Sequence, residues 1–175
     1  MLACATHAAD FHIDPQRSHA DFGVRLLWVR QVTGRFQQIG GEVNFNGRRD
    51  TATVDARIDV NSVAMDSDRF RRWVLAPEFF DVEHYPTIRF VSAPVTLDKL
   101  QDGGDLSGWL TLRGITQPTV LEILPSHCRL DAAPTCTIEL RGSVQRSDFN
   151  MSGHRATLSD RVELGLSIEL DREQG

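Results

Sequence analysis

Residues 161–171, RVELGLSIELD, alternate apolar and polar side chains through their whole length. Successive side chains of a β-strand point to opposite faces, so this period of two predicts a strand with one apolar and one water-facing side. A chain that repeats this pattern must bury every apolar side against another, and the number of repeats therefore indicates the fold class. The apolar side of this first strand carries Val162, Leu164, Leu166, Ile168 and Leu170.

The same alternation recurs along the chain, clearly in three segments and more weakly in four. In the weaker segments, the pair Gly40-Gly41 predicts a bulge or bend, and Val120 and Leu124 are interpreted as one apolar face. Turn-forming sequences such as NGRRD and DGGD separate the segments. The clear segments are 20–28 (ADFGVRLLW, with Trp28 as the last apolar position), 53–60 and 137–145, and the weaker ones are 31–45, 87–97, 105–113 and 116–124.

One segment departs from the period of two. Residues 67–76, SDRFRRWVLA, place Phe70, Trp73 and Val74 at the i, i+3 and i+4 spacing of a helix. Pro77 follows directly and cannot continue a helix. We therefore expect about eight strands and one short helix near residues 67–76.

Eight antiparallel strands that are apolar on one side bury that side either by closing into a barrel or by stacking as two sheets. Several of the expected strands are longer than the usual ~5–6 residues. Long, bent strands suit a barrel of about eight strands, whose interior holds packed side chains or one small ligand. The pattern alone leaves the two-sheet sandwich open.

Composition limits the domain count and the partners. With 175 residues, 41% of them apolar and 25% charged, the chain suits one globular domain, which we place at 11–172. The net charge of -5 argues against a nucleic-acid partner, because nucleic acids select for basic surfaces. No run of about 18 apolar residues occurs, so we expect no membrane span.

Two features indicate the compartment. Residues 1–10, MLACATHAAD, resemble the tail of a secretory signal peptide, with a disordered tail as the alternative. Cys128 and Cys136 flank the turn sequence LDAAPT, and a hairpin can bring such a pair within disulfide distance; two reduced, buried thiols are the alternative. A signal sequence and a disulfide both favour an oxidising compartment, so we expect a periplasmic or secreted protein.

Four motifs follow one another along the chain. The first contains Ile13, Asp14, Ser18, Phe22 and Val24, with Gly34 and Phe36 further on. The others are EFFDVEHYPTIRFVS at 78–92, LSGWLTLRGITQPTVL at 106–121 and QRSDFNM at 145–151. Together they resemble, in order, the motifs of the YceI-like family from residue 11 to about residue 170.

This resemblance implies an all-β, lipocalin-like, eight-stranded antiparallel barrel around an elongated apolar cavity, and so selects the barrel over the sandwich. It also implies a hydrophobic small-molecule ligand, an isoprenoid or another long-chain lipid, that is carried or sequestered without catalysis and without a cofactor. The oligomeric state is left open, with a homodimer as one possibility. The ligand-binding residues that we expect are Phe22, Val24, Leu26, Phe36, Phe45, Trp73, Phe79, Phe80, Phe90, Leu110, Leu112, Ile138, Leu140, Phe149 and Leu166.

Two positions depart from the family's pattern. Leu26 and Trp73 stand where family members often carry histidine, so no metal or head-group role is transferred to them. The alternative function is therefore a structural or interaction protein whose barrel is filled by its own aromatic side chains. The six histidines show no metal-ligand spacing, and no nucleophile elbow or phosphate loop occurs, so we expect neither a metal site nor an enzyme.

The charged members of the motifs are Asp81, Arg113, Arg146 and Asp148. One interpretation places them at the rim of the barrel, where they contact a polar head group. The other, which we favour, pairs the acids with the arginines to fix turns.

Overall fold

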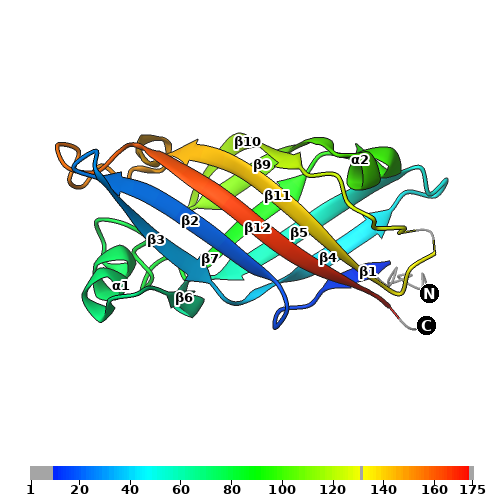
Figure 1. The fold of residues 1–175 in the computed structure, drawn as a ribbon, viewed down its shortest axis with the longest axis horizontal. Coiled ribbons are helices and arrows are strands. Elements are labelled where there is room, and N and C mark those ends of the chain that lie inside the picture. Colours follow the sequence, from blue (N-terminus) through cyan, green and yellow to red (C-terminus); the bar gives the residue numbers. More distant parts are fainter. Residues whose placement is uncertain (1–9, 131, 174–175) are drawn as a thin grey trace, which may run out of the picture.

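The strands of the protein follow one another around a barrel in chain order (Figure 1). The computed structural model describes residues 10–130 and 132–173. The strands are β1 (Phe11–Ile13), β2 (His19–Leu26), β3 (Arg30–Phe36), β4 (Ile39–Phe45), β5 (Thr51–Asp59), β6 (Val63–Ala64), β7 (Thr87–Ser92), β8 (Val95–Thr96), β9 (Gly104–Leu112), β10 (Ile115–Ile123), β11 (Thr135–Gln145) and β12 (Arg161–Arg172). The helices are α1 (Asp68–Leu75) and α2 (Leu97–Asp102), with single 3₁₀ turns at η1 (Val60–Ser62) and η2 (Arg146–Phe149).

The barrel is closed by β12, which pairs with β11 along its length and with β1 and β2 on its other edge. β1 and β2 form one interrupted barrel strand, and β3 and β4 form its interrupted neighbour, because β1 pairs with β4 and β2 with β3. With β5, β7, β9, β10, β11 and β12 this makes eight barrel strands, all antiparallel to their neighbours. The closed barrel is confirmed, and the two-sheet sandwich is wrong.

The register between strands aligns their apolar sides. Ile138 of β11 lies opposite Ile168 of β12, and Leu140 lies opposite Leu166. Because side chains alternate between faces, this register places every apolar residue of the two strands inside and their charged neighbours outside. The 161–171 alternation thus forms one continuous apolar wall of the barrel.

The end of the barrel near α2 is tightly packed. Phe11 of β1 is 0% exposed, and Ile123 at the end of β10 is 1% exposed. Val95 of β8 and Leu100 of α2 are each 4% exposed and belong to the same apolar cluster. Side chains at protein-core density leave no passage for a solute, so this end of the barrel is closed.

The helix expected at 67–76 is confirmed as α1, which begins after Ser67 and ends before Ala76 and Pro77. It lies at the opposite end of the barrel from α2 (Figure 1). The second helix, α2, differs from the expectation, in which the strand pattern of 87–97 continues to Leu97. Its sequence, LDKLQD, offers only Leu97 and Leu100 as apolar positions, which is too short a pattern to separate from a strand end.

Other strand details differ from the sequence expectation. The break in 31–45 falls at Gln37 and Gln38, not at Gly40-Gly41, because the Ser62 hydroxyl accepts both of these backbone N–H groups at 3.1 Å. Gly41 lies inside β4 with φ of 145°, where a Cβ would lie 2.1 Å from the carbonyl oxygen of Asp55. Glycine there permits close approach of β5 and not a bend.

Two apolar faces were misread from the sequence. In β10, Leu121 and Ile123 are buried, whereas Val120 is 53% exposed, so the inward face carries the odd-numbered positions. The run Thr119–Ile123 has apolar residues on both faces, which leaves the face undetermined without the register to β9. Trp28 does not end an inward face, because it lies in the turn after β2 and is 73% exposed.

The disulfide between Cys128 and Cys136 is present, with 5.3 Å between the Cα atoms. Both cysteines are buried, and Leu130 between them is 1% exposed. The bridge therefore attaches the connection between β10 and β11 to the closed end of the barrel. The signal-like segment 1–10 lies, except for Asp10, outside the described residues.

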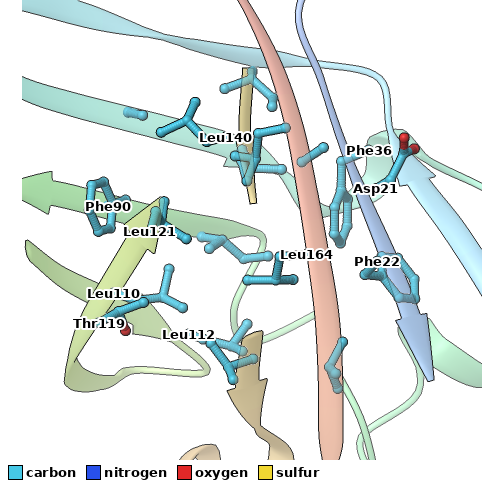
Figure 2. A pocket seen from close by; sticks show the side chains of 18 of the residues that line it. Asp21, Phe22, Phe36, Phe90, Leu110, Leu112, Thr119, Leu121, Leu140 and Leu164 are labelled. Atoms are coloured by element: carbon cyan, nitrogen blue, oxygen red, sulfur yellow. The ribbon is translucent and has the colours of Figure 1, made fainter. Parts of the chain in front are cut away.

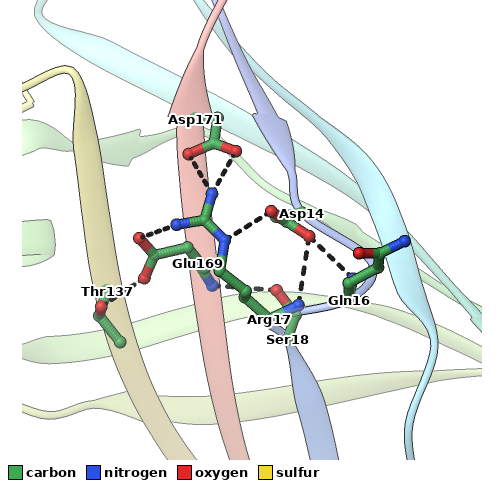
Figure 3. A network of polar contacts seen from close by, with 7 residues as sticks. All are labelled: Asp14, Gln16, Arg17, Ser18, Thr137, Glu169 and Asp171. Atoms are coloured by element: carbon green, nitrogen blue, oxygen red, sulfur yellow. Dashed lines mark hydrogen bonds and ion pairs between the residues drawn. The ribbon is translucent and has the colours of Figure 1, made fainter.

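A polar network attaches the bulge between β1 and β2 to β12 (Figure 3). The Arg17 guanidinium donates to Asp14 at 2.6 Å, to Asp171 at 2.7 Å and to Glu169 at 3.3 Å. The hydrogen bond from Arg17 holds the pKa of Asp14 below its usual range. The Ser18 hydroxyl, which is 2% exposed, accepts the backbone N–H of Glu169 at 3.0 Å and completes the attachment.

Candidate functional site: an apolar cavity along the barrel

The barrel encloses an elongated cavity. The space open to the centre of a water-sized sphere is about 190 Å³, whereas one water molecule needs roughly 10–15 Å³ by this measure. The lining extends from Ile13 and Leu170 near the closed end to Phe79 and Met151 near α1. Figure 2 shows lining side chains from opposite walls, such as Leu110 and Phe36, pointing toward the same space.

Most of the ligand-binding residues expected from the sequence line this cavity. Three others do not, namely Leu26, Phe45 and Phe149. The expected residues that do line it are Phe22, Val24, Phe36, Trp73, Phe79, Phe80, Phe90, Leu110, Leu112, Ile138, Leu140 and Leu166.

The three exceptions have other partners. Leu26 forms a bridge to Leu158 at the end of β2. The Phe45 ring packs at 5.9 Å from the Phe11 ring at the closed end, with the Arg49 guanidinium 4.5 Å above it. Phe149 lies in η2 and is 1% exposed within the core. All three positions are therefore at the ends of the barrel, where the chain covers the interior.

Exposure along the walls indicates that the middle of the barrel is hollow. Phe90, Leu110, Leu164 and Leu166 point inward and line the cavity, yet they are only partly buried. In a barrel filled by its own side chains these central positions would be the most buried. The filled-barrel alternative therefore does not describe this interior.

Two inward-facing glycines let aromatic rings lie against the wall. A Cβ on Gly34 would lie 2.3 Å from the Phe22 ring, and one on Gly108 would lie 2.6 Å from the Phe90 ring. In the register, Gly34 lies directly opposite Phe22. Gly108 lies opposite Ser92, two positions along β7 from Phe90. The rings thus occupy the space of a missing side chain instead of the centre of the barrel.

Aromatic side chains cover the α1 end of the cavity. The Phe80 ring lies 5.8 Å from the Phe22 ring and 5.4 Å from the Phe36 ring. Trp73 of α1 contacts Phe79 at 4.7 Å and His154 at 4.9 Å. Trp73 and Phe80 are only partly buried, whereas Phe79 is 5% exposed, so this cover is partly open to solvent.

The polar members of the lining are Asp21, Thr119 and Arg146. Arg146 is 4% exposed, and its guanidinium donates to the carbonyl oxygens of Met151 at 2.7 Å, Ser159 at 2.9 Å, Gly153 at 3.0 Å and Leu158 at 3.3 Å. Burial lowers the pKa of Arg146. Since its N–H groups are engaged by the chain itself, Arg146 fixes the loop after η2 and is not presented to a ligand.

The expected acid–arginine pairs do not form. Arg113 donates to the carbonyl oxygens of Asn150 at 2.7 Å and Pro77 at 3.1 Å, while Asp81 bonds His84 at 2.9 Å. The hydrogen bond to Asp81 raises the pKa of His84. The arginines of the motifs do fix turns, as expected, but through backbone carbonyls and not through Asp81 or Asp148.

Several lining residues were absent from the sequence expectation. They include Val54, Ala56 and Ile58 of β5, Val144 of β11 and Leu164 of β12. Their period of two was visible in the sequence and was sufficient to find them. Among residues 10–130 and 132–173, no three His, Cys, Asp or Glu side chains are grouped as a metal site requires.

A closed, eight-stranded, antiparallel barrel around an apolar cavity defines a lipocalin-like protein. Comparison of the sequence gives the family: a family model described as a YceI-like domain matches residues 11–170. The chain belongs to the YceI-like family. Within the described residues, no helix is both long and apolar enough to cross a bilayer.

Curated relatives are similar in sequence, and solved structures share the fold. The chain is 29% identical to Protein YceI of Salmonella arizonae over 167 residues, which cover 93% of this chain and 86% of the relative. The crystal structure of Burkholderia cenocepacia BcnA superposes with a TM-score of 0.76 at 18% identity, over 90% of this chain and 98% of that chain. A polyisoprenoid binding domain from Saccharophagus degradans superposes with a TM-score of 0.72 at 16% identity, over 95% and 100% of the two chains.

Proposed function

We propose that this protein binds one long apolar chain, an isoprenoid or another lipid, along the axis of its barrel and carries or sequesters it. The observation that carries the proposal is the elongated cavity, whose lining is apolar except for three residues. The name of the Saccharophagus degradans domain, which describes polyisoprenoid binding, supports the same ligand class.

The dimensions of the cavity suit an extended chain. Lining residues on β12 extend from Val162 to Leu170, and a tilted strand of this length covers about 20 Å along a barrel axis. Each buried methylene contributes about 0.8 kcal/mol. A chain that occupies most of this length therefore gains enough from burial to offset the cost of association without any hydrogen bond.

We further propose that the protein is not an enzyme. Both charged lining residues are engaged by the chain itself: Arg146 is held by four backbone carbonyls, and the Asp21 carboxylate accepts from Arg35 at 2.6 and 2.8 Å. General acid–base or nucleophilic catalysis requires groups that can reach the substrate with a free donor or acceptor. A carrier role requires none of these groups.

The access route that we propose is at the α1 end. At the α2 end Phe11, Ile123, Val95 and Leu100 are at most 4% exposed, whereas Trp73 and Phe80 at the α1 end are only partly buried. The pairing of β3 also favours access at this end. One edge of β3 pairs with β2, whereas on the other edge β6 pairs only with Arg35 and Phe36 among the described residues. The edge of β3 next to α1 is thus without a strand partner and can separate from α1 at low cost.

For the compartment we propose the periplasm or the cell exterior. The Cys128–Cys136 disulfide supports an oxidising environment. Membership of the YceI-like family is consistent with that location.

The proposal is tested by titrating the protein with geranylgeraniol and measuring its melting temperature. We expect saturable stabilisation of the natural sequence and no stabilisation of Leu110→Trp, which fills the cavity from an inward position on β9. Ser107→Trp adds the same side chain on the outer face of the same strand and should leave the stabilisation unchanged. If neither the natural protein nor Ser107→Trp is stabilised by prenyl or acyl chains, the proposal is wrong.

A further inference from the structure

The turn between β2 and β3 exposes three consecutive apolar side chains. Leu27, Trp28 and Val29, which we call the β2–β3 tip, are 56%, 73% and 90% exposed. They are the most exposed large apolar side chains among the described residues. Single exposed apolar residues are common on protein surfaces, but three in a row at the end of a hairpin form an apolar projection that the fold itself does not use.

Local backbone structure does not account for these residues. Leu27 and Trp28 have φ of 52° and 64°, and the Val29 N–H donates to the Leu26 carbonyl at 3.3 Å. A turn with positive φ at both central positions favours Asn and Gly and disfavours bulky side chains. The chain therefore carries Leu and Trp where turn stability selects against them, which indicates a role in contact with something outside the chain.

The tip is fixed to the neighbouring loop after η2. The Leu27 N–H donates to the Thr157 carbonyl at 2.6 Å, and Leu26 forms a bridge to Leu158. The Ser159 N–H donates to the Arg25 carbonyl at 2.9 Å. Both segments lie at the α1 end of the barrel (Figure 1), so the tip and this loop present one surface.

This surface carries three exposed arginines, and the nearby carboxylates have other partners: Asp160 bonds Ser147, and Glu78 lies 3.4 Å from His154. Arg25 and Arg30 flank the tip, Arg155 lies on the neighbouring loop, and all three are exposed. Within residues 10–130 and 132–173 none of the three forms an ion pair, and the Arg30 guanidinium lies 5.8 Å from the Phe70 ring of α1. On the barrel wall, in contrast, arginines bond carboxylates, as Arg17, Arg35, Arg89 and Arg141 do.

We propose that the β2–β3 tip docks the protein on a lipid bilayer that carries anionic head groups. Leu27 and Val29 would enter the acyl boundary and Trp28 the head-group region, where tryptophan is favoured. Arg25, Arg30 and Arg155 would meet lipid phosphates, although the protein as a whole carries a net charge of -5. The N–H groups of Leu27 and Val29 are already bonded to the chain, which lowers the cost of moving the turn into an apolar environment.

Docking here would place the cavity beside the membrane. Arg30 lies over Phe70, the Phe70 and Trp73 rings are 6.1 Å apart, and Trp73 lines the cavity. An apolar cargo could then pass between bilayer and barrel at the α1 end with a short path through water. Membrane docking does not depend on the cargo, and the two are measured separately.

The test is cosedimentation with phosphatidylcholine vesicles prepared with and without phosphatidylglycerol. We expect binding to the anionic vesicles, with a blue shift of tryptophan emission. The double variant Leu27→Asn, Trp28→Gly should lose binding on the order of tenfold or more. Because Asn-Gly is the favoured sequence for this turn, that variant should melt at or above the temperature of the natural protein, and lost binding cannot then be attributed to misfolding.

Charge and position are tested by two further variants. Arg30→Gln with Arg155→Gln should weaken binding to anionic vesicles about fivefold for each arginine and leave binding to neutral vesicles unchanged. Trp109→Ser with Val120→Ser removes two side chains of 52% and 53% exposure from the middle of the barrel wall and should have no effect. A wall variant that loses binding as strongly as the tip variant would contradict docking through the tip.

Further outcomes overturn the docking proposal or separate it from the proposed cargo. Absence of binding to anionic vesicles, or equal binding by the Leu27→Asn, Trp28→Gly variant, excludes bilayer docking by the tip. A concentration-dependent dimer in solution that this variant abolishes would assign the tip to contact between two copies instead. If the cavity takes up no prenyl chain while vesicle binding still depends on the tip, docking stands and the proposed cargo fails.

Discussion

At the scale of single residues, the width of the cavity depends on inward-facing glycines as much as on the large side chains that line it. Gly34 faces inward opposite Phe22 and makes room for its ring. We predict that Gly34→Ala displaces the ring toward the centre of the barrel, with a loss of stability of about 1–3 kcal/mol from overpacking and weaker binding of a prenyl chain. Chemical denaturation and a titration with geranylgeraniol measure the two effects.

The matched control is Gly165→Ala. No atom lies within 4 Å of the Cβ position at Gly165, so the added methyl group displaces no side chain. If Gly34→Ala binds the prenyl chain as well as Gly165→Ala does, the position of the Phe22 ring does not set the width of the cavity.

Arg146 is predicted to act on stability and not on ligand choice. Arg146→Met removes a buried guanidinium and leaves four carbonyl oxygens of the loop after η2 without their donors. We expect a loss of about 3 kcal/mol or more, measured by urea denaturation. Arg161→Met removes an exposed arginine that bonds Glu163 and should cost less than about 0.5 kcal/mol. Equal effects of the two substitutions would contradict the assigned role.

The sequence pattern predicted which residues line the cavity better than it predicted the hydrogen-bond partners of the charged residues. Most expected residues line the cavity because period-two alternation decides which side chains point inward. Pattern could not show that Arg113 and Arg146 bond carbonyls instead of Asp81 and Asp148, because those contacts depend on where distant loops meet. It also could not place Trp28 outside, since the last apolar position of a strand and the first position of a turn look alike.

At the scale of elements, the disulfide is expected to stabilise the connection between β10 and β11. Cys128 and Cys136 are eight positions apart, and closing a loop of this length contributes about 2–3 kcal/mol in the chain-entropy account. We predict a loss of this size in Cys128→Ala with Cys136→Ala, measured by denaturation in a Cys4→Ser background that prevents thiol exchange. A reductant should lower the melting temperature only where both cysteines remain. A melting temperature that ignores the reductant would contradict a stabilising bridge.

Cross-strand ion pairs give the barrel wall a dependence on acid pH. The hydrogen bonds from Arg35 to Asp21 and from Arg89 to Asp55 hold the pKa of each carboxyl below its usual range. A lowered folded-state pKa means that the stabilisation is present above the unfolded value of about 4 and is lost as pH falls through the folded value. We predict that Asp21→Asn with Asp55→Asn melts a few degrees below the natural protein at neutral pH, and that the difference disappears in acid.

The control for this titration is Asp105→Asn, which changes an exposed carboxylate on β9 for which the described residues provide no ion pair. Its melting curve should follow that of the natural protein at both pH values. A gap between the double variant and the natural protein that stays constant into acid would show that the ion pairs are not its cause.

The elements themselves were predictable where the pattern was long. β12 and α1 were found from period-two and i, i+3, i+4 spacing, because each pattern is read over about a whole element. α2 was missed because six residues with two apolar positions carry too little periodicity. The face of β10 was misread because only its register to β9 distinguishes Leu121 from Val120.

At the scale of the whole molecule, the closed barrel follows from eight strands that each have one apolar side, but whether its interior is hollow does not. Alternation is the same in a filled barrel and in one that holds a ligand. The two barrels differ in the size and placement of their inward side chains, such as glycine at positions 34 and 108 beneath aromatic rings. These pairings can be recognised only when the register is known. The family resemblance supplied the expectation of a cavity that the residues alone did not.

The central claim is that the hollow of this barrel holds an apolar chain. Native mass spectrometry of the intact protein, purified without detergent and then offered geranylgeraniol, tests it most directly. We predict a species heavier than the bare chain by one ligand, which is retained in Ser107→Trp and absent in Leu110→Trp. Only the bare mass, in the natural protein and in both variants, would contradict the claim.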